Sequence, residues 1–175
     1  MKKMKTLFEQ DENYKVIPVL RKKIDNYSVS VKKDGTSCMI KDNVLYKRYD
    51  ANRKKGRKLP NEYIECQEKP NHNGSFPVWV KINENDKYHI EAFLEKVFWE
   101  NGTYELCGVK INGNKENIQG HKLLKHGDEQ VYGINLNFEE IKEYLTNNYI
   151  EGLIIKDESD GELFKIRRKD FGLKW

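Results

Sequence analysis

The chain has 175 residues, of which 37% are hydrophobic and 34% are charged, and its formal net charge is +4. This length suits one compact domain over residues 1–175, and an aromatic content of 11% excludes a mostly disordered chain. No apolar run approaches the roughly 20 residues of a membrane helix, and no secretory signal is visible, so we expect no membrane partner.

The cysteines argue for a reducing environment. Cys38, Cys66 and Cys107 are far apart and form no C-x-x-C pair. An odd and scattered set excludes a disulfide framework and a cysteine-based zinc site. We therefore expect a cytoplasmic protein, and we expect it to be a monomer.

The first elements predicted along the chain are strands. Residues 27–33 alternate between apolar and polar side chains. Residues 38–40 and 44–46 flank Asp42-Asn43, a pair typical of a tight hairpin turn. These patterns predict an antiparallel arrangement in the first third of the chain.

Two helices are predicted by apolar residues at helical spacing. Asp86 can cap the first helix, which should end near Asn101. Its apolar face is formed by Ile90, Phe93, Leu94, Val97 and Phe98. Asn137 can cap the second helix, which has Ile141 and Leu145 on its inner face.

Further strands are predicted at residues 102–111, 150–157 and 162–168, the last after an Asp160-Gly161 turn. Antiparallel strands with two inserted helices indicate an α+β fold.

Strand parity places charged side chains opposite apolar pairs. Neighbouring side chains of a strand point to opposite faces. By this rule the Lys32 side chain points away from the face of its valine neighbours. Glu105 points away from the face of Tyr104 and Leu106. In the last strand, Lys165 and Arg167 share the face opposite to Phe164 and Ile166. An ordinary half-buried strand has the same pattern, so no single strand identifies a site.

The order of short motifs is more specific than any one of them. The motifs are KKDGTS at 32–37, KRYD at 47–50, YELCG at 104–108, EGLIIK at 151–156 and FKIR at 164–167. In this order they resemble the motifs of the covalent nucleotidyltransferase superfamily, which contains ATP-dependent DNA ligases, RNA ligases and mRNA-capping enzymes.

Additional stretches narrow the resemblance. Residues 45–50, 77–80, 108–114, 124–127 and 169–172 are similar to the stand-alone RNA ligases of the vertebrate 5′–3′ type. The similarity covers most of the chain from about residue 17 onward and suits a small viral or phage member of that type. It implies an ATP-grasp-like nucleotidyltransferase domain of antiparallel sheets with flanking helices. No OB domain is visible, which favours an RNA ligase over DNA ligases and capping enzymes.

The resemblance implies an activity and assigns residues to it. The expected enzyme joins RNA 5′-phosphate and 3′-hydroxyl ends through a lysyl-AMP intermediate, as in RNA repair. Lys32 would be the nucleophile, Lys165 would contact the α-phosphate, and Arg167 would support the departing or incoming phosphate. Glu105 would bind the ribose hydroxyls, and Arg48 would grip a phosphate. By parity Lys33 belongs to the other face and is expected to be a solvated neighbour.

The expected small molecules are ATP and Mg²⁺, with Mn²⁺ as an alternative ion. Glu151 would hold the metal or orient Lys32, and Asp34 would orient Lys32 or touch the metal. Mg²⁺ keeps part of its water shell, so one or two carboxylates suffice. The base-stacking residue is not identified, so the choice of ATP over GTP rests on the resemblance.

Other functions stay open at this stage. One alternative is a capping-type guanylyltransferase or a DNA nick ligase catalytic domain, and another is a catalytically silent module that binds RNA ends. The basic cluster, defined as Arg53, Lys54, Lys55, Arg57 and Lys58, can attract nucleic-acid phosphates or can be a solubilising loop.

Overall fold

The computed structural model describes residues 4–68, 70–71 and 73–175 and divides into two compact units. The terminal unit consists of Met4–Lys33 and His126–Trp175, and the central unit contains Asp34–Lys125. Residues 1–3, part of the stretch in which no secretory signal is predicted, lie outside the described residues.

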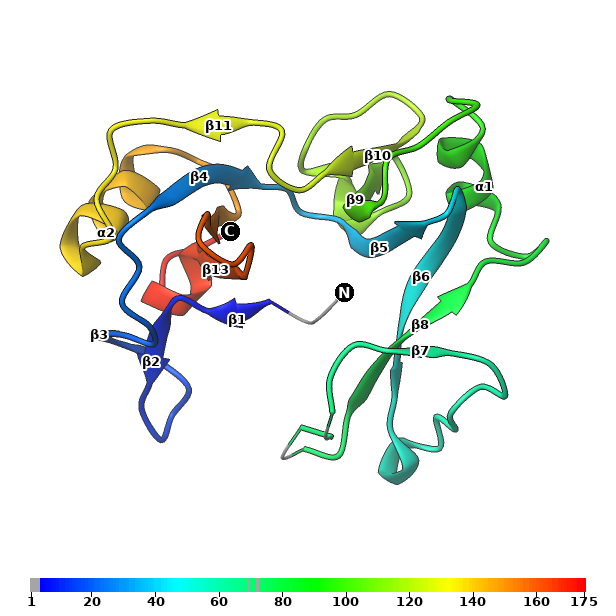
Figure 1. Ribbon diagram of the computed structural model, residues 1–175, viewed down its shortest axis with the longest axis horizontal. Helices are drawn as coiled ribbons and strands as arrows, with labels where there is room; N and C mark the ends of the chain where they lie inside the picture. Colours follow the sequence, from blue (N-terminus) through cyan, green and yellow to red (C-terminus); the bar gives the residue numbers. More distant parts are fainter. Residues whose placement is uncertain (1–3, 69, 72) are drawn as a thin grey trace. The chain divides into compact units, whose positions relative to one another are not determined.

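The terminal unit is built on a five-stranded sheet (Figure 1). The strand order is β1 (Lys5–Thr6), β13 (Leu163–Arg167), β12 (Gly152–Asp157), β4 (Tyr27–Lys32) and β11 (Gln130–Val131). Only the β1–β13 pair is parallel among the described strands of this sheet. The short strands β2 (Phe8–Gln10) and β3 (Val16–Leu20) form a separate antiparallel pair.

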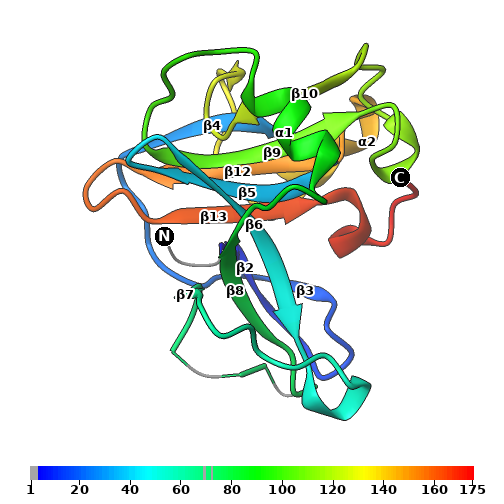
Figure 2. The same ribbon diagram turned by 90° about the vertical axis from the view of Figure 1, so that its right-hand side faces the viewer.

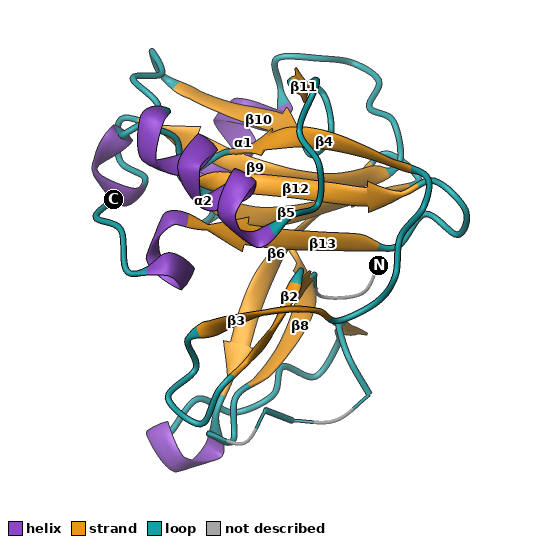
Figure 3. Cartoon of the chain, turned by 90° about the vertical axis from the view of Figure 1, so that its left-hand side faces the viewer, coloured by secondary structure: helices purple, strands orange, loops and turns teal. Residues whose placement is uncertain are grey.

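The second predicted helix is confirmed as α2 (Phe138–Asn147). The Asn137 side chain accepts hydrogen bonds from the Glu139 and Glu140 amides, which satisfies two of the otherwise unpaired groups at the helix start. Ile141 and Leu145 are fully buried in one core with the apolar face of β4, β12 and β13. Helix α2 therefore covers this face of the sheet (Figure 3).

The central unit contains a six-stranded antiparallel sheet. Its order is β10 (His121–Lys125), β9 (Gly102–Gly108), β5 (Thr36–Lys41), β6 (Val44–Ala51), β8 (Phe76–Lys81) and β7 (Ile64–Glu65). The predicted β5–β6 hairpin is confirmed, with Asp42 and Asn43 at φ values of 53° and 56°. Two left-handed residues in the turn match the twist of the paired strands.

The first predicted helix is shorter than its apolar spacing indicates. Helix α1 spans Lys87–Phe93, and Leu94, Val97 and Phe98 lie beyond it as exposed residues. The indole Nε1 of Trp99 donates a 2.9 Å hydrogen bond to the carbonyl of Phe93, and its ring is buried in a core with residues of β5, β6 and β9. Helix α1 lies beside β10 (Figure 2). Burial of this large ring draws the chain away from the helix axis.

The fold is mixed α+β with mostly antiparallel sheets, as predicted. The strand predicted at residues 102–111 ends at Gly108, where the backbone turns into a loop with left-handed residues. Strands of two or three residues, such as β1, β2, β7 and β11, were not predicted because they are too short to show alternation. Within the described ranges, no helix is long and apolar enough to cross a membrane.

Candidate functional site

Three neighbouring strands of the terminal unit bring the predicted basic residues to one sheet face. Lys32 of β4 lies opposite Gly152 of β12, which in turn lies opposite Arg167 of β13. The next row on this face contains Ser30, Ile154 and Lys165. Paired residues share a face, so the register confirms the predicted parity of Lys32, Lys165 and Arg167.

Gly152 allows the close approach of the two strands that flank this row. A Cβ atom on Gly152 would lie 2.2 Å from the carbonyl oxygen of Ile166 and 2.8 Å from Cα of Arg167. Both are backbone atoms that cannot rotate away. The glycine of the 151–156 motif is therefore required by the packing of β12 against β13, and it leaves no side chain between Lys32 and Arg167.

Lys32 forms a short ion pair with Glu151. Its Nζ lies 2.6 Å from Glu151 Oε2 and also donates a 3.0 Å hydrogen bond to the backbone oxygen of Lys33. The two side chains are only 10% and 13% exposed. A charge removed from water to this degree needs such partners. Of the two predicted roles of Glu151, this contact favours the one that orients Lys32.

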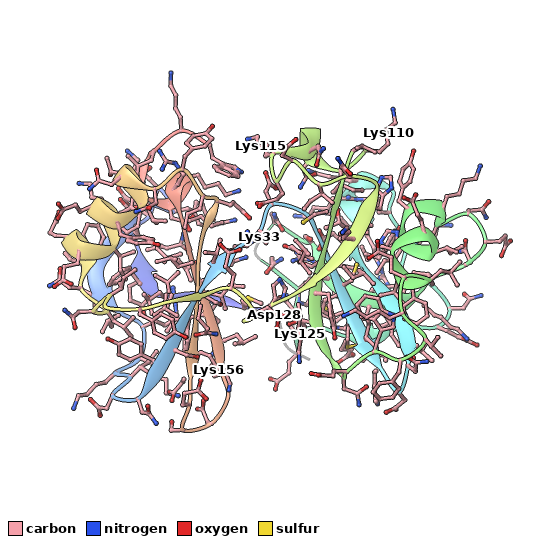
Figure 4. All side chains as sticks on the ribbon, turned by 90° about the horizontal axis from the view of Figure 1, so that it is seen from above. Lys33, Lys110, Lys115, Lys125, Asp128 and Lys156 are labelled. Carbon is pink, nitrogen blue, oxygen red and sulfur yellow. The ribbon has the colours of Figure 1, made fainter. Side chains whose placement is uncertain are left out.

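Lys33 differs from Lys32 in both partner and burial. Its Nζ pairs with Glu129 Oε2 at 2.6 Å, and the Glu129 side chain is 57% exposed. Figure 4 labels Lys33 just beyond the end of β4. Lys33 was expected to be a solvated neighbour, but its own side chain is only 24% exposed, because it packs into this ion pair.

Arg167 is held by a carboxylate that the sequence patterns did not single out. Its Nε and Nη2 donate to Asp170 at 3.1 and 2.8 Å, and its backbone amide donates to the same side chain at 2.9 Å. Asp170 is buried and lies in the turn that follows β13. The signal that could have found it is a capping box, because Arg167 is the extended N-cap of the 3-10 turn Arg168–Phe171 and Asp170 is the third residue of that turn. The guanidinium is thus fixed in orientation, with part of its donor set engaged.

In the central unit, Arg48 and Glu105 share one sheet face. Met39 pairs with Tyr46 on one side and with Thr103 on the other. Two residues further along these strands come Ser37, Arg48 and Glu105, which by parity face the same way. Small Ser37 therefore lies between the two charged positions, and its Oγ is 3.5 Å from Glu105 Oε1.

The two central-unit charges differ in exposure. Glu105 is 3% exposed, whereas Arg48 is half-buried and donates to Asp50 Oδ1 from Nε and Nη2 at 3.2 and 3.0 Å. Lys47, the neighbour of Arg48, instead bonds Asp86. Burial works against ionisation of Asp86, but hydrogen bonds from Lys47 and the Asn83 amide hold its pKa below the ordinary value.

Asp34 is engaged within the central unit. Its Oδ1 accepts a 2.8 Å hydrogen bond from Asn112 Nδ2, and its backbone amide donates to Glu116 Oε1 at 2.8 Å. Neither Asn112 nor Glu116 was predicted, because they follow Asp34 by about 80 positions and carry no recognisable spacing.

The predicted residues thus form two groups, one in each unit. Lys32, Glu151, Lys165 and Arg167 belong to the terminal unit, and Asp34, Arg48 and Glu105 belong to the central unit. Among the described residues, no three histidine, cysteine or acidic side chains gather as a metal site. Glu151 offers a single carboxylate, and its Oε2 is already paired with Lys32 Nζ at 2.6 Å.

The cysteines do not extend the site. Cys38, Cys66 and Cys107 are free and buried. Burial raises the pKa of the Cys38 thiol, which keeps it protonated and a poor nucleophile.

A scan against protein-family models finds no match, and a search of curated proteins finds no significant relative.

Proposed function

We propose that this chain is an ATP-dependent RNA ligase that works through a covalent adduct between Lys32 and AMP. The observation that carries the proposal is the buried Lys32–Glu151 pair, 2.6 Å long, on the sheet face that also bears Lys165 and Arg167. Lysine side chains are rarely buried unless they are paired, and a buried lysine–glutamate pair beside two further cations is a candidate for a functional site. The ordered motifs described above supply the reaction class.

In the first step the Lys32 amine attacks the α-phosphorus of ATP. The nitrogen–phosphorus bond forms, and the bond from the α-phosphorus to the oxygen that bridges to the β-phosphate breaks, so that pyrophosphate leaves with the electron pair. Nζ has to lose a proton before its lone pair can attack, and Glu151 Oε2, which accepts its hydrogen bond at 2.6 Å, can take that proton. Lys165 and Arg167 stabilise the negative charge that develops on the phosphate oxygens.

The later steps move AMP onto RNA. An oxygen of an RNA 5′-phosphate attacks the lysine-bound phosphorus, and the nitrogen–phosphorus bond breaks with return of a proton to Lys32. A 3′-hydroxyl then loses its proton as it attacks the activated 5′-phosphate, and AMP leaves. Mg²⁺, when bound, neutralises phosphate charge, and Glu151 is the proposed protein ligand. Arg48 and Glu105 remain the proposed contacts for a phosphate and for the ribose.

Covalent labelling tests the proposal. We expect label from [α-³²P]ATP, but not from [α-³²P]GTP, to stay on the denatured wild-type chain. Lys32→Ala should abolish the adduct, while the matched variant Lys33→Ala should keep it, because Lys33 belongs to a different and more exposed ion pair. Mass spectrometry should place one AMP on Lys32. An adduct with GTP would indicate a capping-type enzyme, and no adduct with either nucleotide would indicate a silent RNA-end-binding module.

A further inference from the structure

The 3-10 turn Arg168–Phe171, which follows directly on β13, carries the carboxylate that holds Arg167 (Figure 2). Buried Asp170 accepts hydrogen bonds from Nε and Nη2 of Arg167 and a third from the Arg167 backbone amide. The backbone bond fixes the carboxylate relative to the strand, and the two side-chain bonds fix the guanidinium relative to the carboxylate. An arginine–carboxylate pair with two such bonds is specific in its geometry as well as in its charge.

The Arg168 side chain ties this turn to the end of helix α2. Arg168 is buried, and its Nη1 donates to the carbonyl oxygens of Leu145 and Asn148, the latter at 3.0 Å. Its Nε donates to the Lys174 carbonyl at 2.6 Å. The last carbonyls of a helix have no partner within the helix, so this guanidinium satisfies groups that would otherwise be unpaired. The start of the turn is therefore anchored on α2.

Two further contacts hold the turn against the core and the strands of the terminal unit. The Phe171 ring meets the rings of Phe138 and Phe8 edge to face, with centroids 5.0 and 6.5 Å away. The Arg168 backbone amide donates to the Glu151 carbonyl at 2.9 Å. The turn is thus fixed both to the core and to the residue whose side chain pairs with the proposed nucleophile.

The contact with Asp170 decides which donors of Arg167 a ligand can use. A guanidinium has five N–H donors, and Asp170 engages the edge formed by Nε and Nη2. The terminal edge, formed by Nη1 and the second hydrogen of Nη2, has no carboxylate partner among the described residues. Two donors on one edge match two oxygens of one phosphate. Arg167 belongs to the same row of the sheet face as Lys32, with side-chain-free Gly152 between them.

We propose that Asp170 is a positioning residue that presents the terminal edge of the Arg167 guanidinium to a phosphate of the bound nucleotide. This inference rests on the proposed function, in which Arg167 stabilises the charge that develops on phosphate oxygens beside Lys32. Without Asp170 the guanidinium rotates about its side-chain bonds, and its donors meet that charge only part of the time. Donors that are oriented in advance lower the barrier most, so the step slows even when ATP is bound.

A double-mutant cycle on adduct formation tests the inference. Asp170→Asn keeps the size of the side chain and one acceptor oxygen, but it cannot accept from both nitrogens of Arg167. At saturating ATP we expect Asp170→Asn to slow adduct formation about 10-fold in the wild-type background. In the Arg167→Ala background the same change should alter the rate by less than about twofold, because Asp170 acts only through Arg167. Equal losses in both backgrounds, or no loss in either, would overturn the inference.

Asp11→Asn is the matched control. Asp11 Oδ1 accepts hydrogen bonds from the amides of Asn13 and Lys15, both at 2.9 Å, so this carboxylate also holds a turn, but one that contains no arginine. The variant should keep the rate of adduct formation within about twofold of wild type. A loss as large as that of Asp170→Asn would mean that any weakened turn slows the step, which would overturn the specific role of Asp170.

Hydrogen exchange at Arg167 Nε provides a readout that does not depend on ligase activity. In ¹⁵N NMR spectra of the full chain, the Nε–H signal of Arg167 is assigned by its loss in Arg167→Lys. Its hydrogen should exchange slowly in wild type and Asp11→Asn, and at least about 10-fold faster in Asp170→Asn. Unchanged exchange in Asp170→Asn would overturn the positioning role. A wild-type chain that forms no adduct would instead refute the proposed function, and the exchange rates would still test the contact with Asp170.

Discussion

Lys32 and Glu151 are 119 positions apart in the sequence, yet their charged atoms lie 2.6 Å from each other. The next lysine repeats this chemistry with a different acid, because Lys33 pairs with Glu129 at the same distance. The first pair is almost fully buried, and the second pair is partly exposed. Adjacent lysines with separate partners provide internal controls for the proposed reaction.

The first prediction concerns the acid of the buried pair. Glu151→Gln keeps an oxygen near Lys32 but cannot take its proton, so adduct formation should slow by about 100-fold or more. Glu129→Gln makes the same change in the exposed pair and should leave the rate within about twofold. Single-turnover labelling with ATP measures both rates. Similar losses in the two variants would show that Glu151 has no special part in the step.

A second prediction concerns the packing of β12 against β13. The backbone contacts of 2.2 and 2.8 Å that a Cβ on Gly152 would make force β13 to move, so Gly152→Ala should lower the free energy of unfolding by about 3 kcal/mol. Gly161→Ala is the control, because its φ of +74° is unfavourable but nothing lies within 4 Å, and it should cost about 1 kcal/mol. Urea denaturation measures both values. Equal losses would mean that β13 adapts freely.

A third prediction concerns acid stability. The hydrogen bond from Lys22, followed by those from Ser159, lowers the pKa of Asp157 to about 2. This value is below that of an unfolded aspartate, about 3.9, so the unfolded chain binds more protons in acid. The stabilisation is complete above the unfolded pKa and is lost as the pH falls from about 4 to about 2.

The variant Asp157→Asn tests this linkage. Its free energy of unfolding should be lower than that of wild type at pH 6, and the difference should shrink as the pH approaches 2. Asp25→Asn, which removes a highly exposed partner of Lys23, should change the pH dependence little. Urea titrations at a series of pH values give the comparison, and a constant difference between Asp157→Asn and wild type would contradict the prediction.

A fourth prediction concerns RNA. All five members of the basic cluster are exposed, and within the described part of the chain none forms an ion pair with a carboxylate. Replacing three of its lysines with glutamine should weaken binding of single-stranded RNA and reduce the slope of log K against log salt by about 2, while adduct formation is spared. The variant carries changes at Lys54, Lys55 and Lys58, and its control carries them at Lys41, Lys110 and Lys122. Identical salt slopes would leave the cluster with a solubilising role alone.

Local patterns predicted those features that depend on neighbours in the chain. The Asn137 cap of α2 and the left-handed Asp42-Asn43 hairpin follow from short-range geometry, and both are confirmed. The predicted end of α1 near Asn101 was wrong, because the apolar spacing continues past Phe93 while burial of Trp99 diverts the backbone. The spacing of apolar residues does not predict which large aromatic ring is buried in the core.

Alternation by itself determined which side chains of a strand share a face, since that depends only on the pleat of one strand. It therefore separated Lys32 from Lys33 and grouped Lys165 with Arg167 before any register was known. Only the tertiary structure decided the partners: Glu151 for Lys32, Asp170 for Arg167, and Asn112 and Glu116 for the Asp34 turn. A hydrogen bond or ion pair requires atoms within about 3 Å. Apart from Asp170, which is three residues from Arg167, these contacts join residues far apart in the sequence, so only folding determines them.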